Sequence, residues 1–192
     1  MIRDEFVWMA GGPQGSGVDS GANIFARACC YGGLHVYGKR EYHSNIKGLH
    51  SYFHVRVSSK EIGADIDRVD LLATFDAETI VRHIWEVSPN GGIIVDKDML
   101  ETRIDAIQPL TPPFRTDFQK TLENRGAKAE TVSDLLNEVK KNNVRTYIVP
   151  YMEILKEIAD EIHEEKLSKL TRMINVLALG VSFGLINYDK AP

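Results

Sequence analysis

The chain has 192 residues, 43% of them hydrophobic, which is enough for one domain with a buried core. Its 23 basic and 27 acidic residues are mixed along the sequence and give a net charge of −4, so no basic tract indicates nucleic-acid binding. The sequence shows neither a signal peptide at its first residues nor an apolar run of membrane-spanning length, which favours a cytoplasmic protein without a membrane partner.

The only two cysteines, Cys29 and Cys30, are neighbours in a segment with helical spacing. Neighbouring side chains on a helix diverge, so we expect two free thiols that pack against the core, with neither a disulfide nor a metal between them. An iron–sulfur cluster ordinarily needs four thiolates. Any cluster chemistry linked to this chain must therefore lie on a partner.

The first structural unit is a strand followed by a glycine loop and a helix. Residues 6–10 form a short apolar run typical of a buried strand, and residues 11–17 read Gly-Gly-Pro-Gln-Gly-Ser-Gly. A helix is then predicted to end at Gly32 and Gly33. Its buried face is indicated by four residues at helical spacing: Val18, Ala22, Phe25 and Cys29.

The rest of the chain alternates strand and helix patterns, which predicts an α/β fold with a largely parallel or mixed central sheet between two layers of helices. Further strands are expected at residues 34–37, 52–58, 69–75, 92–95 and 145–149. Helices are expected at 77–87 with Asp76 as the cap, at 114–124, at 131–141 with a cap near Ser133, after Pro150, and from Leu167 with Met173 and Leu177 on its buried face. A turn is expected at residues 89–92.

We expect one domain over residues 1–192. Between residues 97 and 143 the alternation weakens, because Pro109, Pro112 and Pro113 interrupt the pattern. This stretch is therefore interpreted as an inserted or peripheral element of the domain.

The glycine loop at residues 11–17 is the sharpest local motif. Glycines let backbone amides turn toward an anion, and the following helix adds the positive end of its dipole, so phosphate binding is one interpretation. A tight turn that needs glycine only for packing is the other. The loop lacks the Gly-Lys-Ser/Thr of a P-loop, and Pro13 departs from the dinucleotide-binding fingerprint.

A second polar segment, residues 37–51, combines cations, small hydroxyls and two glycines. It would clamp a polyphosphate, face a partner, or form a solvated loop. His43, His50 and His54 mix loop and strand positions without a carboxylate in register, so no metal site is predicted. No catalytic set of residues is recognisable either.

Together, residues 12–21 (Gly-Pro-Gln-Gly-Ser-Gly-Val-Asp-Ser-Gly) and 37–51 (Tyr-Gly-Lys-Arg-Glu-Tyr-His-Ser-Asn-Ile-Lys-Gly-Leu-His-Ser) resemble the gamma domain of the 2-oxoacid:ferredoxin oxidoreductases, which act on acids such as pyruvate or 2-oxoglutarate. The sequence is most similar to the form in which this domain precedes the alpha region of a fused subunit. Residues 175–180 resemble the closing helix of the family. The chain ends near the point where fused members continue, so it is expected to be either part of a longer subunit or a short separate gene product.

The resemblance implies a component of a complex with alpha and beta subunits or domains, in which a 2-oxoacid is decarboxylated, electrons pass to ferredoxin and the acyl group passes to coenzyme A. It places thiamine diphosphate, Mg²⁺ and the iron–sulfur clusters on partner domains, and makes coenzyme A a ligand shared with this chain. The implied contacts to coenzyme A are Gly12, Gln14, Gly15, Ser16, Gly17, Lys39, Arg40, Ser44, Lys47, Gly48, His50 and Ser51. A free-standing nucleotide-binding module and a purely structural assembly domain are the alternatives.

Overall fold

A six-stranded sheet forms the centre of the computed structural model, which describes residues 5–41, 50–170 and 173–186. The strand order is β2-β3-β1-β4-β5-β6. The strands are β1 (Glu5–Pro13), β2 (His35–Glu41), β3 (His50–Ser58), β4 (Val69–Thr74), β5 (Val87–Asp96) and β6 (Arg145–Val149). Strands β1, β4, β5 and β6 are parallel, whereas β3 runs antiparallel between β1 and β2. The predicted mixed α/β sheet is thus confirmed.

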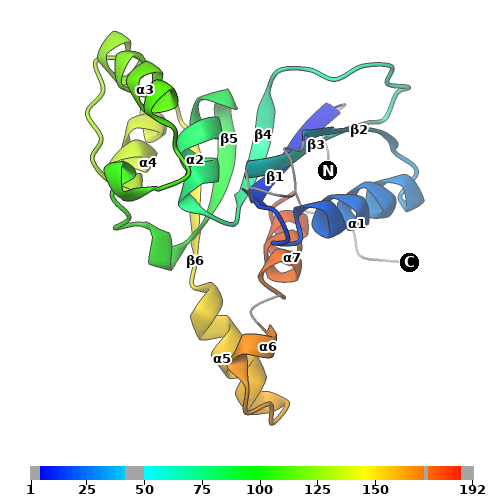
Figure 1. Cartoon of the computed structure of the whole chain (residues 1–192). Helices are drawn as coiled ribbons and strands as arrows, with labels where there is room; N and C mark the ends of the chain where they lie inside the picture. Colours follow the sequence, from blue (N-terminus) through cyan, green and yellow to red (C-terminus); the bar gives the residue numbers. More distant parts are fainter. Residues whose placement is uncertain (1–4, 42–49, 171–172, 187–192) are drawn as a thin grey trace.

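Helices cover both faces of this sheet (Figure 1). Helices α1 (Val18–Tyr31) and α7 (Ile174–Leu185) pack on one face, and α2 (Ala77–His83), α3 (Pro112–Asn124) and α4 (Val132–Lys140) lie on the other. Short 3-10 turns occur at Ile84–Glu86, Lys97–Met99 and Ile104–Ala106. Helices α5 (Tyr151–Glu161) and α6 (Leu167–Leu170) project away from the sheet, as Figure 1 shows.

The alternation of side chains along β1 divides the core into two halves. Trp8 and Ala10 face α1 and α7, whereas Met9 faces the α2 side. The Trp8 ring stacks on Phe25 of α1 at a centroid distance of 4.6 Å, and its indole N–H donates to Ser182 Oγ of α7 at 3.0 Å. The last described helix is therefore joined to the first strand through the core.

Three local predictions, for a turn, a helix cap and a helix face, are wrong. The turn expected at residues 89–92 does not end the strand: it lies within the bounds of β5, where the register with β4 shifts between the pair of Val69 with Val87 and the pair of Leu71 with Gly92. The cap of α4 is Thr131, which forms a capping box with Asp134, and Ser133 lies inside the helix.

The third concerns the C-terminal helix, which is divided into α6 and α7. Of its two expected core residues, Leu177 is partly buried against the core, whereas Met173 is not. Met173 lies outside α7 with 37% of its surface exposed. The buried face of α7 consists of Asn175, Ala178, Leu179 and Ser182. Polar residues take this face because Asn175 and Ser182 have hydrogen-bond partners on other elements, Gly17 and Trp8.

The two cysteines have different surroundings. Cys29 lies on the buried face of α1, and burial raises the pKa of its thiol to about 12. Cys30 is exposed. Both are free thiols, as predicted, although only Cys29 contributes to the core. Among the described helices, none combines the length and apolar character needed to cross a membrane.

Candidate functional site

The connections that follow β1 and β4 diverge, and the name crevice is used for the junction between them at the ends of these two strands. The two strands are parallel neighbours, but β1 leads into α1 on one face of the sheet and β4 leads into α2 on the other. Such a divergence of connections at the carboxyl ends of parallel strands is the usual place for ligands in open α/β sheets. Residues 11–17, which connect β1 to α1 at this place, are therefore a candidate ligand-binding loop.

The second polar segment ends at the same place. Because β3 is antiparallel to β1, its first residues lie beside the last residues of β1: His50 pairs with Pro13, and Ser51 pairs with Gly12. Two motifs that are far apart in the sequence are thereby brought together at the crevice. Of the predicted contact residues, Ser44, Lys47 and Gly48 fall outside the described part of the chain.

The glycine loop has the backbone geometry of a tight strand-to-helix connection. Gly15 and Gly17 have φ angles of 86° and 91°, in the left-handed region that favours glycine. The amide of Ser16 donates to the carbonyl of Pro13 at 3.0 Å, which closes the turn. The first helical bond joins Gly21 N to Gly17 O, so the preceding amides of α1 have no acceptor within the helix and point toward the crevice end.

Two serine hydroxyls lie at this junction. Ser16 Oγ in the loop and Ser51 Oγ on β3 are both buried, and neither has a hydrogen-bond partner among the described residues. Buried hydroxyls are normally satisfied. These two therefore fit a polar ligand group, such as a phosphate oxygen, at the end of β1.

The two cations of β2 point to opposite faces of the sheet. Arg40 lies on the α1 side, 3.3 Å from Asp19 in the first turn of that helix. Lys39 lies on the other side, 3.5 Å from Glu41 and 3.8 Å from Asp65. It lines a polar pocket of about 230 Å³ whose remaining walls are Tyr52, His54, Asp65, Asp67 and Glu86. Arg40, and not Lys39, is thus on the side of the glycine loop.

His50 lies on the α2 side of the crevice and is buried. One of its ring nitrogens and the carboxylates of Asp76 and Glu78 lie within 4.8 Å of one another, a spacing compatible with a metal ion. Both carboxylates already have structural roles, however. Asp76 caps α2 through Thr79 N at 2.8 Å, and Glu78 pairs with Arg82 at 2.7 Å.

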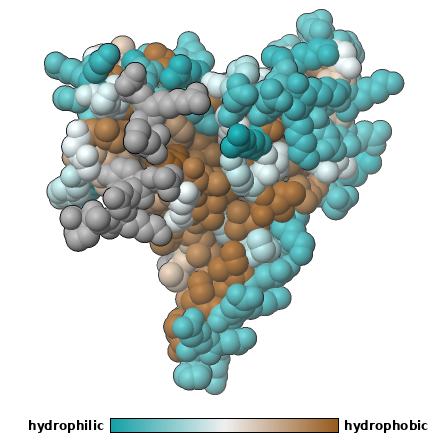
Figure 2. Space-filling model, turned by 180° about the vertical axis from the view of Figure 1, so that it is seen from behind, coloured by the Kyte–Doolittle hydropathy of each residue, from teal (hydrophilic) through white to brown (hydrophobic). Residues whose placement is uncertain are grey.

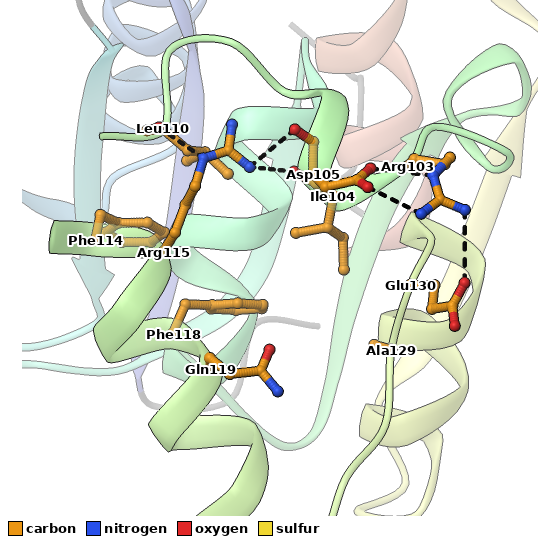
Figure 3. A pocket seen from close by; sticks show the side chains of 10 residues that line it. All are labelled: Arg103, Ile104, Asp105, Leu110, Phe114, Arg115, Phe118, Gln119, Ala129 and Glu130. Atoms are coloured by element: carbon orange, nitrogen blue, oxygen red, sulfur yellow. Dashed lines mark hydrogen bonds and ion pairs between the residues drawn. The ribbon is translucent and has the colours of Figure 1, made fainter. Parts of the chain in front are cut away.

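Another pocket, of about 380 Å³, lies between α3 and the segment before α4 (Figure 3). Its apolar walls include Ile104 and Phe118. The guanidinium of Arg115 is occupied by the carbonyls of Ile104, Asp105, Ile107 and Leu110. Arg103 is paired with Asp105 and Glu130. Both arginines are thus held by groups of the pocket wall itself.

Sequence reasoning missed one residue that supports the glycine loop. Asn175 Nδ2 donates to Gly17 O at 3.4 Å, and a Cβ atom at Gly17 would lie 2.1 Å from that nitrogen. A polar residue on the buried face of an otherwise apolar helix is the signal that would have indicated this contact.

Residues 7–191 match the family described as pyruvate ferredoxin/flavodoxin oxidoreductase. The chain belongs to this family. It is 38% identical over 182 residues to the alpha subunit of 2-oxoacid:ferredoxin oxidoreductase 1 of Sulfurisphaera tokodaii, a match that covers 95% of this chain. The chain spans only 28% of the length of that relative.

Solved structures with the same fold include the gamma subunit of a keto/oxoacid ferredoxin oxidoreductase from Geobacter sulfurreducens, with a TM-score of 0.56 and 15% identity over 94% of this chain and 76% of that one. Another is the 2-oxoglutarate:ferredoxin oxidoreductase from Magnetococcus marinus with 2-oxoglutarate, coenzyme A and succinyl-CoA bound. It has a TM-score of 0.51 and 19% identity over 98% of this chain and 32% of that one. At these identities the similarity concerns the fold of this family member.

Replacing Gly17 with alanine should destabilise the family fold at its glycine loop. The positive φ costs about 1–3 kcal/mol for a residue with a Cβ atom, and the side chain of Asn175 would have to move. Thermal or urea unfolding measures the loss. Gly21→Ala is the matched control, because a Cβ atom there meets nothing within 4 Å and alanine favours the helix. Equal stability of the two variants would contradict this account of the loop.

Proposed function

We propose that this chain is the gamma-type component of a 2-oxoacid:ferredoxin oxidoreductase and that it contacts the phosphates of coenzyme A at the end of β1. The observation that carries the proposal is the convergence of the glycine loop with the start of β3, where Gly12 pairs with Ser51. The contact residues proposed from the family resemblance include Gly12, Gln14, Gly15, Ser16, Gly17, Arg40, His50 and Ser51.

The chemistry of the junction fits a phosphate. The first amides of α1 and the hydroxyls of Ser16 and Ser51 are hydrogen-bond donors, and Arg40 supplies positive charge beside them. The Magnetococcus marinus neighbour holds coenzyme A, which supports the choice of this phosphate-bearing ligand. Lys39 lies on the opposite face of the sheet, so it would act on the phosphate only through long-range electrostatic attraction and not by direct contact.

The remaining chemistry is proposed for partner domains. There, thiamine diphosphate with Mg²⁺ would decarboxylate the 2-oxoacid and iron–sulfur clusters would carry the electrons to ferredoxin, while the acyl group is transferred to coenzyme A. With two cysteines, this chain has too few thiolates for a cluster of its own. Because the reaction draws on coenzyme A and ferredoxin, we place the complex in the cytoplasm.

An apolar surface supports assembly with partner subunits. From behind, apolar residues extend from the middle of the body onto the projection that α5 and α6 form (Figure 2). The exposed large apolar side chains in this part of the sequence are Ile148, Ile162, Met173, Val176 and Leu185. Strand β6 is also a sheet edge among the described strands. Surfaces of this kind are typical of protein interfaces.

We further propose that residues 1–192 act as one domain, with 97–143 as its peripheral element. This stretch joins β5 to β6, and its helices α3 and α4 pack with α2 over one face of the sheet. It therefore adds to the fold without lining the crevice.

Coenzyme A should bind this chain with an affinity that depends on the two serine hydroxyls. Each lost hydrogen bond to a charged phosphate is worth about 1.5–3 kcal/mol, so Ser16→Ala and Ser51→Ala should each weaken binding at least about tenfold in titration calorimetry. Ser133→Ala, on the far α4, should leave the affinity unchanged. A wild-type chain without measurable affinity would favour a purely structural assembly domain, and unchanged affinity in both variants would exclude this site.

The chain should also co-purify with partners that carry the redox cofactors. Tagged protein from its native host is expected to bring down polypeptides with iron–sulfur clusters and thiamine diphosphate, and the eluate should reduce a low-potential dye with a 2-oxoacid only when coenzyme A is added. A colourless, inactive protein that binds nucleotides alone would instead favour a free-standing nucleotide-binding module.

A further inference from the structure

An acidic residue lies in the first turn of the helix that follows the glycine loop. Asp19 is the second residue of α1, and its side chain is about half exposed. The amides of this turn have no acceptor within the helix and are the ones that the proposed site offers to a phosphate. A carboxylate at this position therefore lies close to the anionic ligand and has the same sign of charge.

Asp19 also pairs with the cation of the proposed site. Its Oδ1 atom is 3.3 Å from Arg40 Nε, and the two side chains are 51% and 45% exposed. Ion pairs with this exposure are weak, because water solvates both partners. An entering phosphate can therefore compete with Asp19 for the guanidinium of Arg40.

The described residues of the junction carry no net positive charge. Residues 11–17 contain no charged side chain, and the hydroxyl of Ser51 is a neutral donor. The charges of Arg40 and Asp19 cancel, and Asp76, the cap of α2 at the end of β4, adds a further carboxylate. Neutral donors without an excess of positive charge favour a singly charged phosphate over a doubly charged one.

We propose that Asp19 is a specificity-determining residue, through which the glycine loop accepts the pyrophosphate of coenzyme A and rejects its 3′-phosphate. This inference rests on the proposed binding of coenzyme A. Each phosphorus of the pyrophosphate carries one negative charge, whereas the 3′-phosphate is a monoester that carries nearly two at neutral pH. Repulsion from Asp19 is therefore about twice as large for the 3′-phosphate. The same repulsion weakens binding of the pyrophosphate, so that coenzyme A remains a ligand that dissociates after the reaction.

Titration of the wild-type chain with coenzyme A and with dephospho-coenzyme A tests which phosphate the loop holds. Loss of the 3′-phosphate should change the affinity by less than about threefold, because a phosphate outside the loop acts only through screened charge. If the loop held the 3′-phosphate instead, the loss of several charge-assisted hydrogen bonds would weaken binding by about a hundredfold or more. A loss beyond about tenfold would overturn the inference.

Asp19→Asn tests the role of the carboxylate. Removing a like charge should tighten coenzyme A binding about three- to tenfold at low salt. This gain should shrink in about 1 M salt, where the screening length is only about 3 Å. Asp117→Asn is the matched control, because it removes the same charge from an exposed pair with Lys120 on α3, and it should leave the affinity unchanged.

A damaged fold cannot produce tighter binding, so a gain in Asp19→Asn reports the lost charge. An affinity equal to that of the wild type, or an equal gain in Asp117→Asn, would overturn the inference while the proposed function stands.

Inorganic pyrophosphate separates the remaining outcomes. If it binds the wild-type chain and binds more tightly to Asp19→Asn, but coenzyme A does not bind, the proposed function fails and the effect of Asp19 on the loop stands. If neither ligand binds, both fail.

Discussion

The antiparallel pairing of β1 with β3 is the interaction on which the candidate site depends. It continues past the apolar part of β1, through both glycines, to the pair of Pro13 and His50. Without this extension, the glycine loop and the second polar segment would be separate surface loops. With it, Ser51 lies beside Gly12 at the end of a parallel strand, next to the loop that carries Ser16 and leads into α1.

The rest of the fold keeps this junction in place from both faces. On one face, α7 supports it through Asn175, which bonds to Gly17, and through Ser182, which accepts the indole N–H of Trp8. On the other face, α2 contributes Thr79 and His83, which pack on Gly11 and His50. Since α7 and α1 are far apart in sequence, the loop depends on the complete domain and not on local glycine chemistry alone.

Local patterns predicted the type of almost every element, because burial on one face gives helices and strands distinct spacings. The bounds of strands were missed where pairing between distant strands decides the outcome. Strand β2 was expected to end at Tyr37, since Gly38 and the charges after it look like a loop, yet pairing with β3 extends it to Glu41. That extension is what sends Lys39 and Arg40 to opposite faces. The contact of His50 with His83 likewise cannot be predicted from the sequence, because it joins residues of β3 and α2 that are 33 positions apart.

Hydrogen–deuterium exchange with and without coenzyme A would test the central claim most directly, because it reports where on the whole chain a ligand acts. We expect protection of the amides of residues 11–21 and 50–52, and no change around the pocket between α3 and α4 at residues 103–119. Protection confined to that second pocket, or no protection at the glycine loop under saturating ligand, would contradict the account.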